Sequence, residues 1–420
     1  MNIISKDSMA VVKWNVLTQA QQVELLQRPV VSTKDLMPNV KSIIQQVRQS
    51  GDAALKDLTL RYDQVQLEQL QVSTAELLSA EAMVTLEIKQ AVKHAAQRIR
   101  EYAEKSLPKN FSLATDGIQC QRVQRPLQRV GLYVPGGSAP LVSTLLMLAI
   151  PAQVVGCKEV VLCTPPQRDG TVNSVLLWAA DLCGISKVFS VGGAQAIAAM
   201  AYGTSSIKKV DKIFGPGNSW VTMAKQLVAQ DPGGTSIDLL AGPSELMVIA
   251  DASSNADFIA ADLLSQAEHG ADSQVYCVTT SQQMAAKINL AVNRQLNNLS
   301  RQQVAAAALS NSSLIVVDNI KQAIDIVNQY APEHLSLQCV SPELIVPLIH
   351  NAGAIFVGPW SAETFGDYVC GANHVLPTSG YASAYSGLAV TDFIKWISVQ
   401  TVSIQGVQSC AQTAINLANL

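Results

Sequence analysis

Gln266 and His269 stand at the end of an apparent helix and are the first residues that could hold a metal ion. The helix begins near Ala256, and Gly270 is a natural stop signal. Because the two residues are three apart, both side chains lie on one helix face and can point at a common object. Imidazole is the commonest protein ligand for zinc, and an amide oxygen also suits a borderline cation. Locally, a histidine that stabilises the helix C-terminus is the simpler explanation, and both explanations stay open.

A second group of reactive side chains is the pair Glu333 and His334. The proline before them predicts a helix start, which would place both residues in the first turn. A carboxylate and an imidazole can divide proton transfers at neutral pH, so the pair could act as general acid and base. The alternative is structural, because a glutamate in the first turn suits the helix dipole.

A glycine-punctuated loop at 366–374 adds Asp367 and His374. It follows a predicted strand at 354–357, and loops at strand ends commonly bind ligands in α/β proteins. Asp367 could be a metal ligand and His374 a substrate contact.

Three glycine-rich turns, each between a predicted strand and a helix, could receive a nucleotide. They are Gly136-Gly137, Gly192-Gly193 and Gly215 with Gly217. Glycine lets the backbone approach a ligand, and the next helix offers free N–H groups to an anion. None of the turns is a GxGxxG fingerprint, and plain turn geometry explains them equally well. The polar residues at or beside these turns are Tyr133, Gln195 and Asn218.

The pattern of strands predicts an α/β fold with parallel sheets. Apolar strands alternate with helices at 129–134, 159–164, 187–191 and 209–214, and again at 246–250, 274–279, 313–317 and 354–357. Residues 1–105 look mostly helical, and the chain turns helical again from about Asp392. We expect two Rossmann-like parallel-sheet α/β domains, one inserted in the other, with smaller helical segments at the N- and C-termini.

Composition indicates a cytoplasmic protein that hides part of its surface. Only 15% of the 420 residues are charged, against roughly 25% in average proteins, so we expect a homo-oligomer. The net charge of −3 gives no basic footprint for nucleic acid, and no segment reads as a signal peptide or membrane span. The eight scattered cysteines form no CxxC pair and suit a reducing compartment.

Seven motifs, taken in order, resemble histidinol dehydrogenase. They are VGLYVPGGSAPL, VGGAQAIAA, VDKIFGPGN, DLLAGPSE, DLLSQAEHG, APEHLSL and GDYVCGANHVLPT. The resemblance runs from about residue 30 to the C-terminus. It implies the NAD-dependent, zinc-requiring oxidation of L-histidinol through the aldehyde to L-histidine, the last steps of histidine biosynthesis. It also implies one zinc per active site and a homodimer with shared active sites.

The resemblance assigns roles to the residues singled out above. It implies that the metal ligands are Gln266, His269 and Asp367, and that Glu333 and His334 are the catalytic pair. The implied NAD contacts are Tyr133, Gln195 and Asn218. The implied substrate contacts are Ser244, Gln266, His269, His334, Asp367 and His374.

The expected domains are 1–30, a helical segment; 31–105 with 241–388, carrying the metal and catalytic residues; 106–240, the inserted NAD-contacting domain; and 389–420, a helical segment. The family's fourth protein ligand to zinc is a histidine in a C-terminal segment, donated across the dimer and preceded by a substrate-binding glutamate. This sequence has no histidine after His374. Truncation, completion of the zinc shell by water and loss of activity are three explanations. The alternative function is therefore a catalytically impaired dimeric homologue that binds NAD or metal.

Overall fold

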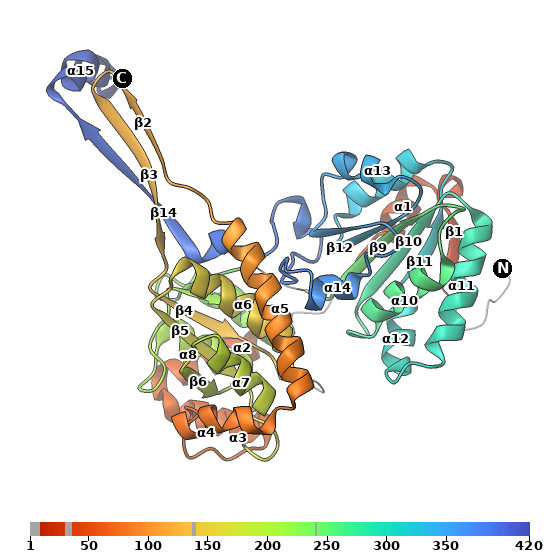
Figure 1. The fold of residues 1–420 in the computed structure, drawn as a ribbon, viewed down its shortest axis with the longest axis horizontal. Coiled ribbons are helices and arrows are strands. Elements are labelled where there is room, and N and C mark those ends of the chain that lie inside the picture. Colours follow the sequence, from red (N-terminus) through yellow and green to blue (C-terminus); the bar gives the residue numbers. More distant parts are fainter. Residues whose placement is uncertain (1–8, 30–35, 137–139, 240–241) are drawn as a thin grey trace.

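Two parallel sheets, each covered by helices on both faces, form the two lobes of the protein in a computed structural model that describes residues 9–29, 36–136, 140–239 and 242–420 (Figure 1). Sheet A has six strands in the order β1-β11-β10-β9-β12-β13. Their bounds are Ala10–Lys13, Ser313–Val316, Gln274–Thr279, Glu245–Ala250, His334–Gln338 and Ala354–Val357. Sheet B has five strands in the order β6-β5-β4-β7-β8. Their bounds are Lys187–Ser190, Glu159–Thr164, Arg129–Tyr133, Lys212–Phe214 and Ser236–Ile237.

The two sheets share one winding pattern. In each, the first strand of the α/β unit (β9 or β4) lies in the middle, the next two extend to one side and the last two to the other. Successive residues of β9 point alternately into two separate cores, as a strand buried on both faces requires. The predicted α/β fold is confirmed, and all eight expected strands are present; the one expected at 209–214 is shortened to β7. Among the described helices, none is long and apolar enough to cross a membrane.

The helices near the N-terminus are divided between the lobes differently from the expected domains. Helices α2 (Leu36–Ser50), α3 (Asp52–Asp63), α4 (Thr74–Ser79) and α5 (Leu86–Lys105) pack around sheet B. The apolar stripe of Val40, Ile43 and Val47 fits against the alanine-rich α8 (Gly193–Tyr202). The structure thus groups residues 36–105 with sheet B, whereas the sequence grouped 31–105 with 241–388. Periodicity showed that these helices were amphipathic, but not which sheet would receive their apolar faces.

The first described residues belong to sheet A. Strand β1 pairs in parallel with β11, and α1 (Gln19–Leu25) follows it, so the helical segment expected at 1–30 is right for α1 and wrong for β1. After α1, the guanidinium of Arg28 lies 2.5 Å and 3.0 Å from the two carboxylate oxygens of Glu245. Arg28 also donates to the Tyr330 carbonyl at 2.7 Å and stacks 3.9 Å over the Tyr330 ring. This partly buried ion pair ties the N-terminal segment to the start of β9.

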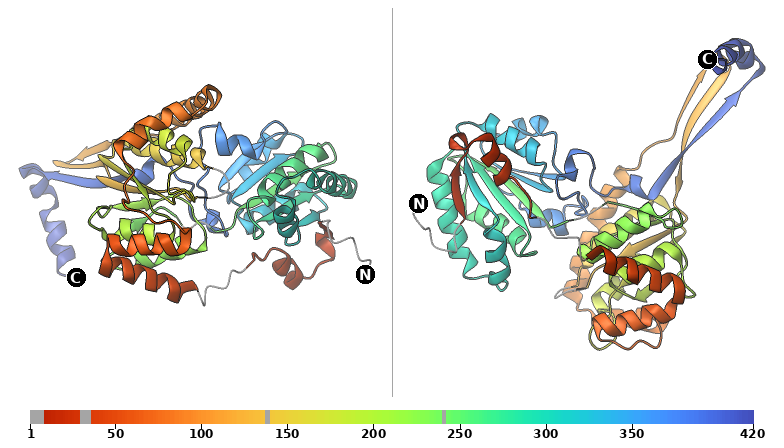
Figure 2. Two further views of the ribbon diagram at one scale, coloured as in Figure 1. Left: turned by 90° about the horizontal axis from the view of Figure 1, so that it is seen from below. Right: turned by 180° about the vertical axis from the view of Figure 1, so that it is seen from behind.

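A long arm projects from the sheet B lobe (Figures 1 and 2). It consists of antiparallel strands β2 (Phe111–Thr115), β3 (Ile118–Pro126) and β14 (Ile394–Val402), followed by α15 (Ile404–Ala418). At its base, the Phe393 ring stacks 4.0 Å from the ring of Phe214. The expected helical segment at 389–420 is therefore wrong for β14 and right for α15. Strand β14 exists only because β3, far away in sequence, supplies its hydrogen bonds.

Replacing Arg28 with methionine is expected to lower the free energy of unfolding by about 3–5 kcal/mol. Glu245 is 3% exposed, and its carboxylate would lose its counter-charge while staying out of water. Urea unfolding followed by tryptophan fluorescence measures the change. The control is Arg294→Met, which breaks an exposed ion pair with Asp257 and should cost less than about 1 kcal/mol. Equal losses in the two variants would contradict this account.

Candidate functional site

The reactive residues lie where the edges of the two sheets face each other. A cavity of about 360 Å³ is lined by Pro135, Thr144 and Gly217 from the sheet B lobe, and by Ser244, Gln266 and Glu333 from the sheet A lobe. Tyr133 ends β4 and Asn218 caps α9 (Ser219–Gln230), so sheet B presents the carboxyl ends of its strands. Ser244 precedes β9 and His334 begins β12, so sheet A presents the amino ends.

The residues of sheet A that line the cavity lie at the amino ends of its strands, which is not the usual ligand-binding edge. Open α/β sheets normally receive ligands at the carboxyl ends of their strands. Here the chain after β9 returns through α10 (Ala256–Ala267), whose last turn brings Gln266 back to the amino edge. The chain after β13 returns in the same way through α14 (Glu363–Tyr368), which carries Asp367. The metal candidates therefore sit on the ends of returning helices.

Helix α10 holds its last turn in place by a cap and a buried face. The Asn255 side chain accepts hydrogen bonds from the first turn, and five apolar residues of the helix lie against sheet A. Gln266 is 1% exposed, and its side-chain oxygen has no hydrogen-bond partner among the described residues. His269 lies just beyond the helix, where its Nδ1 bonds to the Ser265 carbonyl at 2.8 Å. That bond leaves Nε2 with a lone pair for another partner.

Helix α14 brings Asp367 to the same place. Gly366 allows this close packing, because a Cβ there would lie 2.6 Å from the Phe356 ring on β13. The Asp367 carboxylate lies 4.0 Å from Nε2 of His269 and 3.5 Å from Nδ1 of His374. His374 also bonds through Nε2 to the Thr144 hydroxyl at 3.0 Å, which connects the two lobes. Burial alone would raise the pKa of Asp367, but His374 and the other nearby histidines hold it below its usual value.

Glu333 and His334 do not start a helix, contrary to the expectation from Pro332. His334 is the first residue of β12, which is hydrogen-bonded between β9 and β13. Its Nδ1 donates to the Glu245 carbonyl at 3.0 Å, and the Glu333 carboxylate accepts from the Glu245 N–H at 2.9 Å. One residue of the neighbouring strand therefore orients both side chains. Strand pairing overrides the local proline signal.

Burial adjusts the protonation of this pair in opposite directions. It lowers the pKa of His334 to about 4, so the imidazole is neutral near pH 7 and Nε2 can accept a proton. Burial, together with the nearby carboxylates, raises the pKa of Glu333 well above its usual range. Both side chains line the cavity. His334 is therefore an unprotonated base at neutral pH. The raised pKa of Glu333 makes its ionised carboxylate a stronger base than an ordinary glutamate.

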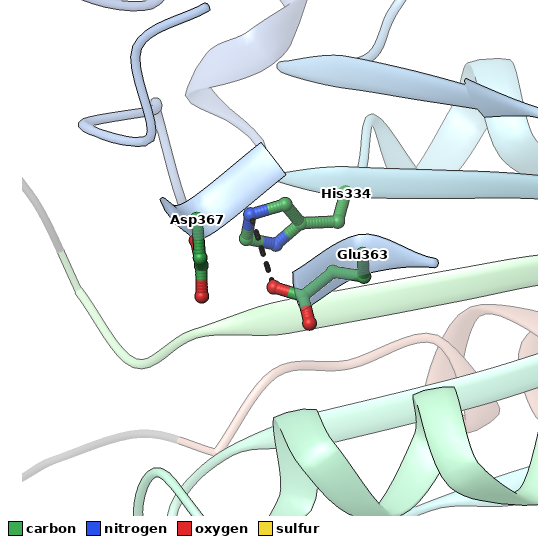
Figure 3. Close-up of side chains that lie close together, drawn as sticks. All are labelled: His334, Glu363 and Asp367. Atoms are coloured by element: carbon green, nitrogen blue, oxygen red, sulfur yellow. Dashed lines mark ion pairs between the residues drawn. The ribbon is translucent and has the colours of Figure 1, made fainter. Parts of the chain in front are cut away.

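Glu363 is a site residue that the sequence reasoning missed (Figure 3). It is fully buried, and one carboxylate oxygen lies 3.8 Å from Nε2 of His334. The other oxygen accepts from the Ser265 hydroxyl at 3.1 Å. Burial, with the charge of Asp367, raises the pKa of Glu363 to about 8. The sequence feature that could have identified Glu363 is its spacing of four residues from Asp367, because residues four apart lie on one face of a helix.

The donor set at this edge fits a cation. His334, Glu363 and Asp367 offer ligand atoms that all lie within 4.8 Å of one another. Two oxygens in this region, one on Gln266 and one on Glu363 itself, are buried without a hydrogen-bond partner among the described residues. Unpaired buried oxygens are costly, and a bound cation would satisfy them. Nitrogen and oxygen donors of this kind suit zinc.

A second cavity, here called the carboxyl-edge pocket, collects the residues expected at the glycine turns. It measures about 550 Å³ and is lined by Tyr133, Gln195 and Asn218, together with Gly136, Gly193 and residues of α2 and α3. Pro135 borders both this pocket and the first cavity. Close packing within the protein also explains some of these glycines. At Gly192, for example, a Cβ atom would lie 2.5 Å from the Pro165 side chain. Gly137 lies outside the described residues.

Comparisons with known proteins agree with this architecture. The family model described as histidinol dehydrogenase matches residues 26–420. Histidinol dehydrogenases of Vibrio parahaemolyticus and Xylella fastidiosa are each 48% identical over 412 residues, covering 98% of this chain and 95% of theirs. The crystal structure of histidinol dehydrogenase from Elizabethkingia anophelis is 43% identical with a TM-score of 0.94, covering 98% of this chain and 94% of that one. Together with the geometry of the two cavities, these matches show that the chain belongs to the histidinol dehydrogenase family.

Proposed function

We propose that this protein oxidises L-histidinol through L-histidinaldehyde to L-histidine, with two NAD and one zinc per active site. The observation that carries the proposal is the junction of the two cavities. Metal-binding and proton-transfer groups line one cavity, the residues expected to contact NAD line the other, and Pro135 borders both. A substrate held in the first cavity would have its reacting carbon next to a nicotinamide that enters from the second. The matches to histidinol dehydrogenases name the substrate.

We assign Gln266, His269 and Asp367 as the zinc ligands. Three observations support this choice: the Gln266 oxygen has no hydrogen-bond partner among the described residues, Nε2 of His269 carries a lone pair, and the Asp367 carboxylate lies 4.0 Å from that nitrogen. Bound zinc would hold the imidazole and the amine of the substrate, and so orient its alcohol carbon. The substrate contacts are the same three ligands together with Ser244, His334 and His374, all of which line the cavity.

His334 and Glu333 divide the proton transfers between the two oxidations. Nδ1 of His334 is engaged by the Glu245 carbonyl, so its Nε2 takes the alcohol proton as hydride passes to the first NAD. The aldehyde stays in the cavity, where Glu333 removes a proton from water as that water adds to the carbonyl carbon. The resulting hydrate gives the second hydride to the second NAD. The groups that bind the substrate would hold the aldehyde in the cavity between the two steps.

The NAD contacts are assigned to Tyr133, Gln195 and Asn218. Tyr133 is buried at the end of β4, where its hydroxyl accepts from the Gly193 N–H at 3.0 Å. The Asn218 carbonyl oxygen caps α9, which leaves its amide group as a donor. The three residues surround one pocket although they come from three separate strand-to-helix connections.

We further propose a homodimer with shared active sites, in which the arm is the contact. All five residues of β2 are exposed, and α15 buries only Gly406. Apolar side chains are nevertheless frequent there: Phe111, Leu113, Ile397, Val402, Ile404 and Leu417 are each at least 42% exposed. Exposed apolar surface of this kind marks an interface. Eight unpaired cysteines also favour the cytoplasm, a reducing compartment, as the site of action. The comparisons do not support a catalytically impaired homologue.

Turnover tests the reaction directly. Zinc-loaded protein given L-histidinol and NAD is expected to form about two NADH per histidine, because the aldehyde is oxidised before release. Absorbance at the NADH band and chromatography of the product measure the ratio. Formation of one NADH with free aldehyde would restrict the activity to the first step, and the absence of NADH would reject the proposal.

His269→Ala is expected to reduce bound zinc from about one per chain to nearly none, because it removes one of three ligands. The side chain is 46% exposed, so the change should cost less than about 1 kcal/mol of stability. Elemental analysis after dialysis measures the metal, with His94→Ala on the exposed face of α5 as the control. Full zinc content in His269→Ala would instead favour the cluster of His334, Glu363 and Asp367 as the ligand set.

Glu333→Gln is expected to slow aldehyde oxidation about 10²- to 10⁴-fold, with a smaller effect on alcohol oxidation. Glutamine can still accept the Glu245 hydrogen bond but cannot take a proton from water. Single-turnover rates with histidinol and with histidinaldehyde separate the two steps. Glu343→Gln, an exposed acid in sheet A's lobe, is the control. Equal slowing of both steps would contradict the water-activating role.

Sedimentation tests the arm as the dimer contact. Wild-type protein should sediment at twice the chain mass of 44.8 kDa, and Leu113→Asp, on the exposed arm strand β2, should shift it toward the monomer. Leu290→Asp places the same charge on α11 (Gln282–Leu296), outside the arm, at a side chain that is 71% exposed, and should remain dimeric. A monomeric wild-type protein would reject the homodimer, and a dimeric Leu113→Asp would place the contact elsewhere.

A further inference from the structure

The wall of the carboxyl-edge pocket contains a carboxylate oxygen that has no partner among the described residues. Asp63 lines this pocket, and its Oδ2 atom is buried without a hydrogen bond to any residue that the structure describes. Within the part of the chain that the structure describes, no lysine or arginine forms an ion pair with it. Burial raises the pKa of this carboxyl.

The position of Asp63 is also unfavourable for a negative charge. It is the last residue of α3, and a helix C-terminus carries a partial negative charge of its own. The chain turns away immediately afterwards through Gln64, which adopts a left-handed conformation. A half-buried carboxylate with an unpaired oxygen at this end of a helix does not stabilise the fold. Such groups commonly serve a ligand.

The expected partner is a sugar with adjacent hydroxyls. Dinucleotide-binding folds bind the adenosine ribose through an acidic residue near the end of their second strand. The second strand here is β5. It is followed by Pro165 and Pro166, neither of which carries a carboxylate. Pro165 and Asp63 line the same pocket, so the helix α3 brings a carboxylate to the place where the strand lacks one.

The surroundings of Asp63 suit the adenosine half of NAD. The nicotinamide must reach the first cavity, whose border with this pocket is at Pro135. Asp63, Tyr62 and Trp220 line the carboxyl-edge pocket and not the first cavity. The rings of Tyr62 and Trp220 lie 6.3 Å apart at 51°, which provides aromatic surface for a base.

Resting on the proposed function, we propose that Asp63 binds the ribose hydroxyls of the adenosine half and makes the enzyme select NAD over NADP. The carboxylate accepts hydrogen bonds from the two hydroxyls, which satisfies its unpaired Oδ2 atom. The 2′-phosphate of NADP would remove one of these donors and bring a second negative charge against the carboxylate. Asp63 is a specificity residue that takes no part in the hydride or proton transfers.

Calorimetric titration of zinc-loaded protein with NAD and with NADP tests the proposal. Wild-type protein is expected to bind NAD more tightly than NADP. Asp63→Asn should weaken NAD about 10- to 100-fold, which is the range for hydrogen bonds to a charged group. It should leave NADP binding unchanged or improve it. Asp57→Asn, on the exposed face of the same helix, is the matched control and should change neither affinity.

Two further measurements separate recognition from a structural role. An NAD analogue without the adenosine 2′-hydroxyl should bind wild-type protein more weakly than NAD, but should bind Asp63→Asn as NAD does. The thermal midpoint of Asp63→Asn should equal or exceed that of the wild type, because the substitution removes a half-buried charge that has no counter-ion. A lower midpoint with equal loss of NAD and NADP affinity would overturn the proposal.

The outcomes also distinguish the inference from the function on which it rests. If wild-type protein binds neither nucleotide, the NAD-dependent function fails, and the role of Asp63 fails with it. If wild-type and Asp63→Asn proteins bind NAD equally, only the role of Asp63 is rejected. Preference for NADP in the wild type would reject the specificity, and would point to the neighbouring Arg61, whose guanidinium lies over the Tyr62 ring.

Discussion

The hydrogen bonds of one residue, Glu245, hold the proposed catalytic pair, Glu333 and His334, together. Its N–H donates to Glu333, its carbonyl accepts from His334, and its buried side chain is neutralised by Arg28. Arg28 in turn reaches the Tyr330 carbonyl, three residues before Glu333. The start of β9, the start of β12 and the N-terminal segment are thereby fixed to one another. Any movement among them would displace both Glu333 and His334, so the partly buried ion pair fixes their positions at a cost in desolvation.

The opposed sheet edges explain why the site contains so many acids. Returning helices bring Glu363 and Asp367 to the amino edge of sheet A, where Glu333 already lies. Three carboxylates so close together repel one another, and two of them, Glu333 and Glu363, are buried. Burial and this repulsion raise the pKa values of Glu333 and Glu363. A bound cation removes much of this penalty. Metal binding would therefore raise the free energy of unfolding of the protein.

Sheet B contributes in a more familiar way. Its carboxyl edge offers helix N-termini and close turns, and Tyr133, Gln195 and Asn218 surround the pocket there. The unusual feature is that α2 and α3, which precede the sheet by many residues, form the far wall of this pocket. The packing of residues 36–63 on sheet B thus decides the shape of the pocket as well as the composition of the lobe.

The sequence by itself determined the alternation of strands and helices, and with it two parallel α/β units, because the strands of each are buried on both faces. It also identified Gln266, His269, Glu333, His334 and Asp367 as reactive residues, since their types and spacing carry chemistry. Only the tertiary structure decided that His334 lies in a strand, that β14 forms an arm with β3, and that Glu363 and Asp63 face the cavities. These features depend on partners distant in sequence, and no local pattern encodes which partner a strand edge, a helix face or a carboxylate will meet.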